Sequence, residues 1–564
     1  MKKMTKLKKM LSLCLTAAVL AFTASDVASA STLPYDSYNY DYREYIHFTP
    51  APYVPSGSIT GSSFTYNGEP LGNFANPQDM CQADDGNIYI ADTGNNRIVV
   101  LDKKMKNVVN VITAFDNNGT EDTFNMPYGV AVSENGQVYV ADSQNHRVVV
   151  LEKDATLVKI VENPKSESLD DNYVFTPLKV TVDYADRIYV IAQNMFEGIM
   201  VFENNGNFSS FFGTIKVEIS LWEKFWKRLA TKEERAKQQL YIPTEFTGID
   251  IDPSGFVYAT NIDSTGVQGV RRLNPRGEDV IKKGQNKNVG GDLWISGTSD
   301  YAGPSQFTDI VYRENGIYSC LDRKRGRIFT YDHEGNLLYI FGGLGTQEGT
   351  FFMPVAIEDI GGSLVVLDAT GASIVCFEET EYGRLINDAV ALRYDGDETQ
   401  AVDLWQRVLE LDENNELANT GIGKAYLTAG DYVNAMKYLK LGMSREYYSI
   451  AYRRYRNSKL TQNANYILTG VVILIVVYQI VKRVVKKKKE QAARERVQKG
   501  GSQNGEVFLK RQMEVYALHG VPSHGRILLD TPCRQRKRAS GHPHGYPVCG
   551  KLLRKPSACQ LRGK

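Results

Sequence analysis

Short runs of alternating hydrophobic and polar residues fill most of the chain before residue 380, and the runs repeat. ADTGNNRIVVLD at 91–102 returns fifty residues later as ADSQNHRVVVLE at 141–152. Within each copy, a turn rich in Asp, Asn and Gly precedes β-rich runs such as IYIAD and RIVVLD. Alternation with a period of two predicts strands, and these turn residues predict the hairpins that join them.

Six such copies follow one another along the chain. They begin at Pro77, Pro127, Pro177, Pro243, Phe307 and Pro354. Repeats of about 45 to 50 residues with three or four short strands each are typical of propeller blades. We therefore predict an all-β, six-bladed propeller over residues 58–380. The alternating run SITGSSFTY at 58–66 is predicted to complete the last blade, because a ring must pair its final edge.

The motif Pro-x-x-apolar, then Asp-Gly-x-Ile/Val-Tyr-Val/Ile-Ala-Asp, then Asn-x-Arg resembles the NHL repeat. This resemblance implies a six-bladed β-propeller. The motif is clear in the first two copies, recognisable in the fifth and degraded in the others. Its acid and arginine are expected to form charge-assisted hydrogen bonds that fix a loop within a blade, with ligand binding as the alternative role. The candidate pairs are Asp92 with Arg97, Asp142 with Arg147, and Asp322 with Arg327.

Two segments interrupt this regular pattern. Residues 31–57 are rich in Tyr and Pro, and we interpret them as an extended strap on the propeller, with a free linker as the alternative. Residues 220–240 form a predicted amphipathic helix inserted in a blade loop. Its apolar face is either packed on the propeller or presented to a partner or a membrane surface. That face consists of Trp222, Phe225, Trp226 and Leu229.

The period changes from strands to helices after residue 380. Gly396, Asp397 and Ala401 recur thirty-four residues later at Gly430, Asp431 and Ala435. This spacing is the period of the tetratricopeptide repeat, which residues 381–462 resemble. They contain two units at most. We predict a short all-α segment that leans on the propeller, on the helix that follows, or on a partner.

Two long apolar segments indicate export and membrane anchoring. Residues 1–30 combine a lysine-rich start, an apolar run and an Ala-Ser-Ala exit, as in a cleaved signal peptide. Residues 464–485 are long enough to span a bilayer, with a buried core helix as the alternative. Lys482, Arg483 and Lys486 to Lys489 lie at the end of this segment, and such charges stay on the cytoplasmic side. We therefore expect a single-pass membrane protein with an extracytoplasmic N-terminal domain.

The basic segment 486–564 changes composition after residue 510, where four of seven histidines and three of seven cysteines occur. A zinc site, binding to anionic lipid, and an out-of-frame or disordered end are the three interpretations, and we favour the last. The order of segments resembles exported Firmicutes proteins that continue into a Yip-family membrane domain. We expect that domain to be missing from this sequence.

Composition and motifs limit the chemistry. The chain has 42% hydrophobic residues and a net charge of +1, which predicts folded domains and gives no overall field for nucleic acid. Cys81, Cys320 and Cys376 have no regular spacing, so we predict no disulfide framework. His47, His146 and His333 occupy different repeat positions. We therefore predict no catalytic residue, no metal and no cofactor, although calcium binding by carboxylates stays open.

These observations favour a binding or scaffolding protein whose propeller and helical repeats take a protein or glycan ligand. The family resemblance suggests a role as an accessory to sugar uptake. The alternative class is a metal-dependent hydrolase or lyase similar to gluconolactonases, because such enzymes also use six-bladed propellers.

Overall fold

The computed structural model describes residues 33–164, 169, 172–214, 245–263, 268–284, 289–293 and 302–516. The predicted signal peptide, the predicted inserted helix at 220–240 and residues 517–564 lie outside the described residues. The chain divides into two compact units, one up to Gln462 and one from Asn463 onward.

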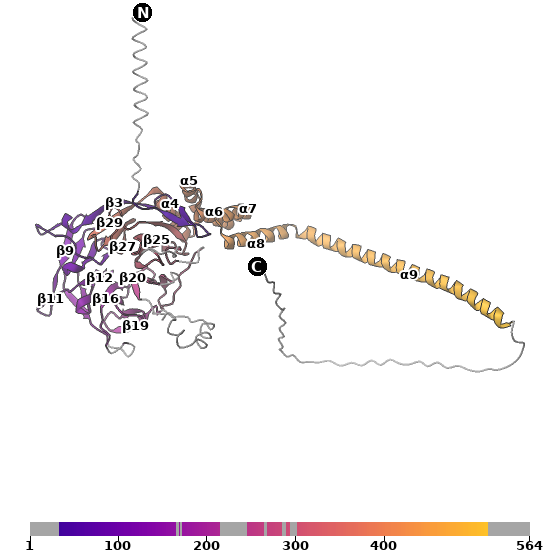
Figure 1. Ribbon diagram of the computed structural model, residues 1–564, viewed down its shortest axis with the longest axis horizontal. Helices are drawn as coiled ribbons and strands as arrows, with labels where there is room; N and C mark the ends of the chain where they lie inside the picture. Colours follow the sequence, from indigo (N-terminus) through magenta and orange to yellow (C-terminus); the bar gives the residue numbers. More distant parts are fainter. Residues whose placement is uncertain are drawn as a thin grey trace, which may run out of the picture. The chain divides into compact units, whose positions relative to one another are not determined.

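Six antiparallel sheets surround a common centre in the first unit (Figure 1). The first three blades consist of β6 (Asp79–Gln82), β7 (Ile88–Asp92), β8 (Arg97–Leu101) and β9 (Val108–Ile112); β12 (Pro127–Val132), β13 (Val138–Asp142), β14 (Arg147–Leu151) and β15 (Leu157–Val161); and β16 (Pro177–Val182), β17 (Ile188–Ala192), β18 (Ile199–Phe202) and β19 (Phe208–Phe212).

The remaining three blades consist of β20 (Phe246–Ile251), β21 (Val257–Asn261) and β22 (Val270–Leu273); β23 (Phe307–Tyr312), β24 (Tyr318–Asp322), β25 (Arg327–Tyr331) and β26 (Leu337–Phe341); and β27 (Pro354–Ile360), β28 (Ser363–Asp368) and β29 (Ser373–Glu379). The predicted six-bladed, all-β propeller is therefore confirmed. Two small hairpins decorate it, β4 (Thr65–Tyr66) with β5 (Glu69–Pro70) and β10 (Ala114–Asn117) with β11 (Thr120–Thr123).

The core lies between neighbouring blades. Every residue of β7 (IYIAD) and β13 (VYVAD) is buried, because these second strands have a sheet packed on both faces. One hydrophobic cluster joins Ile98 and Val100 of the first blade to Val138 and Val140 of the second. Each repeat supplies part of a core that its neighbour completes, so a closed ring is required.

The ring closes through β3 (Tyr53–Thr60), which pairs with β29 as the outer strand of the last blade. The predicted closing strand, 58–66, is thus displaced toward the N-terminus. The strand ends at Thr60 because residues 61–63 form a 3-10 turn. It includes Pro55, which is tolerated because β3 is an edge strand with no further strand to bond.

Residues 38–48 lie against the fifth blade. β1 (Tyr38–Tyr40) and β2 (Ile46–Phe48) form a hairpin, and Tyr38 continues the sheet opposite Ile340 of β26. The hydroxyls of Tyr38 and Tyr40 each donate to the Asp292 carboxylate at 2.7 Å. We call residues 38–48 the strap hairpin.

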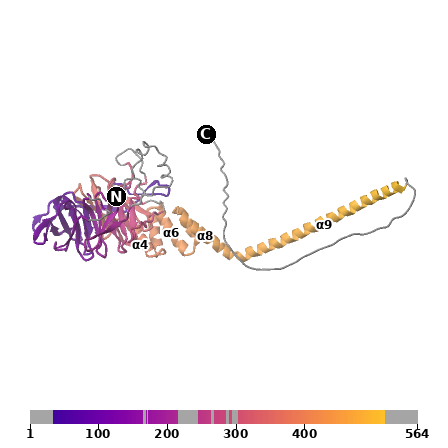
Figure 2. The same ribbon diagram turned by 90° about the horizontal axis from the view of Figure 1, so that it is seen from below.

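Five helices follow β29 in the same unit, α4 (Glu381–Tyr394), α5 (Ala401–Leu411), α6 (Glu416–Thr428), α7 (Tyr432–Leu441) and α8 (Arg445–Gln462) (Figure 2). Side-chain caps begin three of them: Thr380, Asn415 and Asp431 accept from backbone N–H groups of α4, α6 and α7. The predicted all-α segment is confirmed as a set of helices.

These helices extend the core of the propeller. Tyr53 and Phe341 of the propeller share one hydrophobic cluster with Leu385, Trp405 and Ile422 of α4, α5 and α6. All five side chains are essentially excluded from solvent. The propeller and the helices therefore depend on each other for burial.

The second unit contains α9 (Ala464–Tyr516). Its part from Ala464 to Val497 is long and apolar enough to cross a membrane, with a mean hydropathy of 2.1 over its most apolar window. By length and composition this helix is a candidate membrane span.

Candidate functional site

The acid of the first repeat lies at the centre of a small hydrogen-bond network. The Asp92 carboxylate is fully buried and accepts from Arg97 Nε at 2.7 Å, from the Asn95 amide at 2.8 Å and from the Ala75 N–H at 2.7 Å. Arg97 also donates to the Leu71 carbonyl. One buried carboxylate thereby fixes both the loop between β7 and β8 and the segment that precedes β6.

The second repeat reproduces this network. Asp142 accepts from Arg147 Nε at 2.8 Å, from the Asn145 amide at 2.8 Å and from the Asn125 N–H at 2.7 Å. Arg147 also pairs with Asp122, which lowers the pKa of that carboxyl to about 2. These contacts all fall within the blade and its own loops.

The same loops also reach the next blade. Thr93 donates to the Pro127 carbonyl at 2.7 Å, and Ser143 donates to the Pro177 carbonyl at 2.5 Å. The motif therefore joins neighbouring repeats as well as fixing its own turn.

The fifth repeat departs from the predicted pair. Asp322 accepts from the Gln306 N–H at 2.9 Å and lies 3.5 Å from Arg325, whereas Arg327 donates to Asp292 at 2.5 Å. The expected partner of Arg327 was wrong, because Asp292 brings a buried carboxylate from another loop to the same place. The Asp292 carboxylate also accepts from the Tyr38 hydroxyl, so Arg327 and the strap hairpin are joined through one acid. The predicted apolar face with Trp222, Phe225, Trp226 and Leu229 lies outside the described residues.

Charged residues line the centre of the ring, and sequence reasoning missed them. Strand register places six residues at one level of the inner strands: Asp79, Gly129, Lys179, Gly248, Asp309 and Ala356. Charged residues in the first, third and fifth blades thus alternate with glycine or alanine in the others. A single charge in an otherwise apolar inner strand was the available signal.

Lys179 is held between two carboxylates at this level. Its Nζ lies 2.5 Å from Asp79 Oδ1 and 3.3 Å from Asp309 Oδ1, and all three residues are buried. The other oxygen of each carboxylate accepts from a backbone N–H of the following blade, Val130 and Ile357 respectively. Burial alone would lower the pKa of Lys179, but Asp309 and Asp79 raise it above its usual range. Lys179 is therefore a fixed ammonium rather than a base.

The glycines beside these charges make room for them. A Cβ on Gly129 would lie 2.6 Å from the Leu178 carbonyl oxygen, and one on Gly248 would lie 2.5 Å from the Cα of Asp309. A larger residue at either position would push the neighbouring strand away. The alternation of charged and small residues is therefore a packing requirement of the ring.

Two further carboxylates lie two residues along the inner strands. Burial raises the pKa of Asp250 to about 7, and burial together with Asp250 raises the pKa of Glu358. Both side chains are part-exposed. Asp250 can therefore exchange a proton near neutral pH. Across the described residues, no three His, Cys, Asp or Glu side chains converge on a point where a metal ion could bind.

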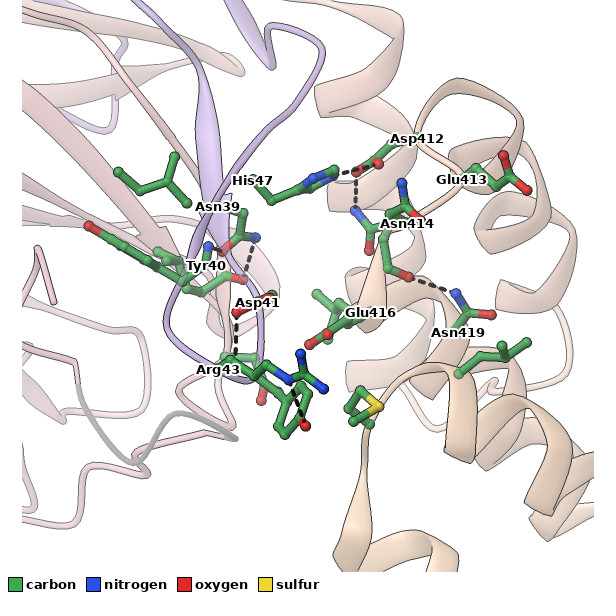
Figure 3. A pocket seen from close by; sticks show the side chains of 18 residues that line it. Asn39, Tyr40, Asp41, Arg43, His47, Asp412, Glu413, Asn414, Glu416 and Asn419 are labelled. Carbon is green, nitrogen blue, oxygen red and sulfur yellow. Dashed lines mark hydrogen bonds and ion pairs between the residues drawn. The ribbon is translucent and has the colours of Figure 1, made fainter. Parts of the chain in front are cut away.

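A cavity of about 500 Å³ lies between the strap hairpin and the helices (Figure 3). Asp41, Arg43 and His47 of the hairpin line one side, and the loop and start of α6 from Asp412 to Asn419 line the other. His47 Nε2 lies 2.9 Å from Asp412 Oδ1, which joins the two sides.

Four carboxylates and one guanidinium line this cavity, which we call the strap pocket: Asp41, Asp412, Glu413, Glu416 and Arg43. Burial first, and the nearby Asp41 second, raise the pKa of Glu416 to about 7. No pattern in the sequence pairs residues 41 and 416, so sequence reasoning could not find this site.

Comparison with known proteins supports the repeat and the fold. Residues 74–101 and 124–151 match the NHL repeat, which confirms the resemblance in the first two copies. No curated protein matches the chain.

Solved structures that resemble the chain include a virginiamycin B lyase from Staphylococcus aureus, with 11% identity over 54% of this chain and 95% of that one and a TM-score of 0.34. A streptogramin B lyase is 14% identical over 61% of this chain and 93% of that one, also with a TM-score of 0.34. A protein described as a candidate gluconolactonase is 12% identical over 59% and 94%, with the same score. At these scores the likeness carries no functional argument.

Proposed function

We propose that this chain is a membrane-anchored binding or scaffolding protein whose propeller and helices lie outside the cytoplasm. The observation that carries the proposal is the strap pocket, built jointly by the propeller's strap hairpin and the helices. Its volume of about 500 Å³ falls in the range of roughly 300 to 1,000 Å³ that is usual for ligand sites. The ligand is a protein or a glycan.

The walls of the pocket are suited to binding because they are fixed before a ligand arrives. Asn39 donates to the carbonyls of Leu337 and Leu338, which holds the hairpin to β26. Asp412 accepts from the Tyr382 hydroxyl and the Asn415 amide, which holds the opposite wall to α4 and α6. A preorganised site loses less freedom when it binds.

We further propose that α4 with α5, and α6 with α7, are two tetratricopeptide-like units. Ala401 and Ala435, thirty-four residues apart in sequence, are both completely buried. Gly396 and Gly430 both have a positive φ, 90° and 83°, in the turns between paired helices. Such units commonly bind peptides or partner helices, which agrees with a pocket on their edge. An accessory role in sugar uptake would follow from the family resemblance.

The anchor and its orientation are tested by labelling in intact cells. The natural cysteines are replaced, and single cysteines are placed at residue 395, in the turn after α4, and at residue 500. Because Lys482, Arg483 and Lys486 to Lys489 follow the apolar segment, residue 500 should resist an impermeant thiol reagent while residue 395 reacts. Labelling of residue 500 alone would show the opposite topology. Release of the chain from membranes by alkaline carbonate would contradict the proposed membrane anchor.

The binding role is tested with the full chain in detergent on peptide and glycan arrays. Selective, saturable retention of one ligand class is expected. In the alternative class, a metal-dependent hydrolase or lyase, the inner-strand carboxylates Asp250 and Glu358 would be the candidate metal ligands. Elemental analysis of the purified chain separates the two: a stoichiometric divalent ion that is lost in the Asp250→Asn variant would favour the enzyme.

A further inference from the structure

The strap pocket has two carboxylates on opposite walls. Asp41 comes from the turn of the strap hairpin and Glu416 from the first turn of α6, and Figure 3 shows their side chains next to each other across the opening. Asp41 Oδ1 accepts from the N–H groups of Arg43 and Tyr45, and the residue lines the cavity. Two elements far apart in sequence thus bring two acids together.

The acids of the pocket outnumber its cations, since Arg43 is the one guanidinium beside four carboxylates. The Arg43 guanidinium is engaged by the Tyr42 ring and hydroxyl, with Nε 2.9 Å from that oxygen. His47 pairs with Asp412. The pocket as a whole therefore has an excess of negative charge and favours a cation.

The rest of the lining supplies amides and apolar contacts. Asn414 presents an exposed amide at the mouth, beside the exposed carboxylate of Glu413. An asparagine amide can donate and accept at once, as a peptide bond does. Tyr42, Ile46 and Leu441 expose 41%, 49% and 55% of their surface around the same cavity. These groups are suited to a peptide ligand, whose backbone offers polar groups and whose side chains lie on either side of a cationic residue.

We propose that the strap pocket binds an extended peptide segment through a lysine or arginine side chain placed between Asp41 and Glu416. This inference rests on the proposed binding function and names its ligand class. The ammonium or guanidinium lies between the two carboxylates, the Asn414 amide bonds the peptide backbone, and the aromatic and aliphatic rim covers the neighbouring side chains.

The test uses the full chain in detergent and fluorescein-labelled decapeptides of glycine and serine with one central lysine. Fluorescence anisotropy should show saturable binding for the lysine peptide and its arginine counterpart, and at least about ten-fold weaker binding for the Nε-acetyllysine peptide. Glu416→Gln and Asp41→Asn should each weaken binding of the lysine peptide by about ten-fold. The matched control is Glu348→Gln, an exposed carboxylate outside the pocket, which should bind normally.

Both pocket variants are expected to fold. Glu416 is already disfavoured as an anion, and Asp41→Asn keeps the Oδ1 acceptor for Arg43 and Tyr45. Equal binding to Glu416→Gln and the unaltered chain, or no binding of the lysine peptide, would overturn the proposal. Binding of a chitosan tetramer in place of the peptide would overturn it in favour of an amino-sugar ligand. If an array ligand binds the Glu416→Gln variant as well as the original chain, the proposed binding function is retained but the strap pocket is not its site.

Discussion

Lys424 of α6 donates to the carboxylate of Glu334, in the turn between β25 and β26, at 2.7 Å. Arg393 of α4 donates to the same carboxylate at 2.6 Å. Both cations are buried, with 5% and 8% of their surface exposed. One propeller turn thus compensates two buried charges of the helices, which explains why the helices and the propeller form one compact unit.

Glu334→Gln should lower the free energy of unfolding by about 3 kcal/mol at pH 7, because it leaves the buried Lys424 without its ion-pair partner and leaves Arg393 only the more distant Asp332, at 3.8 Å. Burial alone would raise the pKa of Glu334, but Lys424 and Arg393 lower it to about 2. A lowered pKa stabilises the fold fully above the unfolded value of 4.5, and this stability is lost as pH falls toward 2. Denaturant unfolding at several pH values measures it.

The control for this prediction is Asp388→Asn, which removes an exposed i,i+4 pair with Arg384. Exposed pairs contribute roughly 0.5 kcal/mol or less, so this variant should unfold like the original chain. If Glu334→Gln changes the free energy of unfolding as little as this control does, the ion pairs of Glu334 do not stabilise the contact between the propeller and the helices.

Lys179→Met should destabilise the propeller by about 3 to 5 kcal/mol, because Asp79 and Asp309 would face each other without a cation. Burial already raises the pKa of Asp309 to about 6 despite Lys179. A raised acid pKa costs stability as pH rises through it, so the loss should be larger at pH 8 than at pH 5. Thermal unfolding at both pH values measures the difference.

A second substitution keeps this prediction testable if the single variant fails to fold. Adding Asp309→Asn to Lys179→Met removes one of the two unpaired charges and should recover part of the stability. The surface counterpart Lys153→Met breaks a pair with Asp85 that is 51% and 33% exposed, and it should cost little. No recovery in the double variant would refute the charge explanation.

Arg97→Ala and Arg147→Ala should each lower the free energy of unfolding by about 1.5 to 3 kcal/mol, as expected for a lost charge-assisted hydrogen bond. Asp92 and Asp142 stay buried and lose their cation. Peptide binding in the strap pocket should be unchanged in both variants. The exposed Arg407→Ala serves as control, since its pair with Glu381 is about half exposed on both sides.

Arg327→Ala should behave differently from the other two arginine variants. Arg327 donates to Asp292, which also holds the hydroxyls of Tyr38 and Tyr40. Hydrogen exchange should therefore accelerate in the strap hairpin at 38–48, whereas Arg97→Ala should leave that segment protected. Faster exchange around Asp322 alone would restore the pairing predicted from the sequence.

The propeller could be predicted because each blade repeats a local signal. Asp92, Arg97 and the turn between them lie within six consecutive residues, and Asp, Asn and Arg return at the same offsets within 142–147. Arg327 could not be paired correctly, because Asp292 belongs to a segment with no repeat pattern. The strap pocket was equally hidden: Asp41 and Glu416 meet because β29 closes the ring by pairing with β3, which follows the strap hairpin, and α4 begins directly after β29. Long-range closure of this kind leaves no trace in local spacing.

Binding of the lysine peptide should tighten as pH rises, because burial and Asp41 raise the pKa of Glu416 to about 7. Below this pH Glu416 is mostly neutral and attracts a cation weakly, and above it the carboxylate is ionised. The other charged groups at the site are Arg43 and His47 on the hairpin and Asp412 and Glu413 beside α6. We expect up to about ten-fold stronger binding at pH 8 than at pH 6, and a flat profile for Glu416→Gln.

A His47→Gln variant is the control for histidine titration, and its binding should show the same dependence on pH as that of the original chain. If the slope persists in Glu416→Gln and disappears in His47→Gln, the histidine rather than the carboxylate governs the pH dependence.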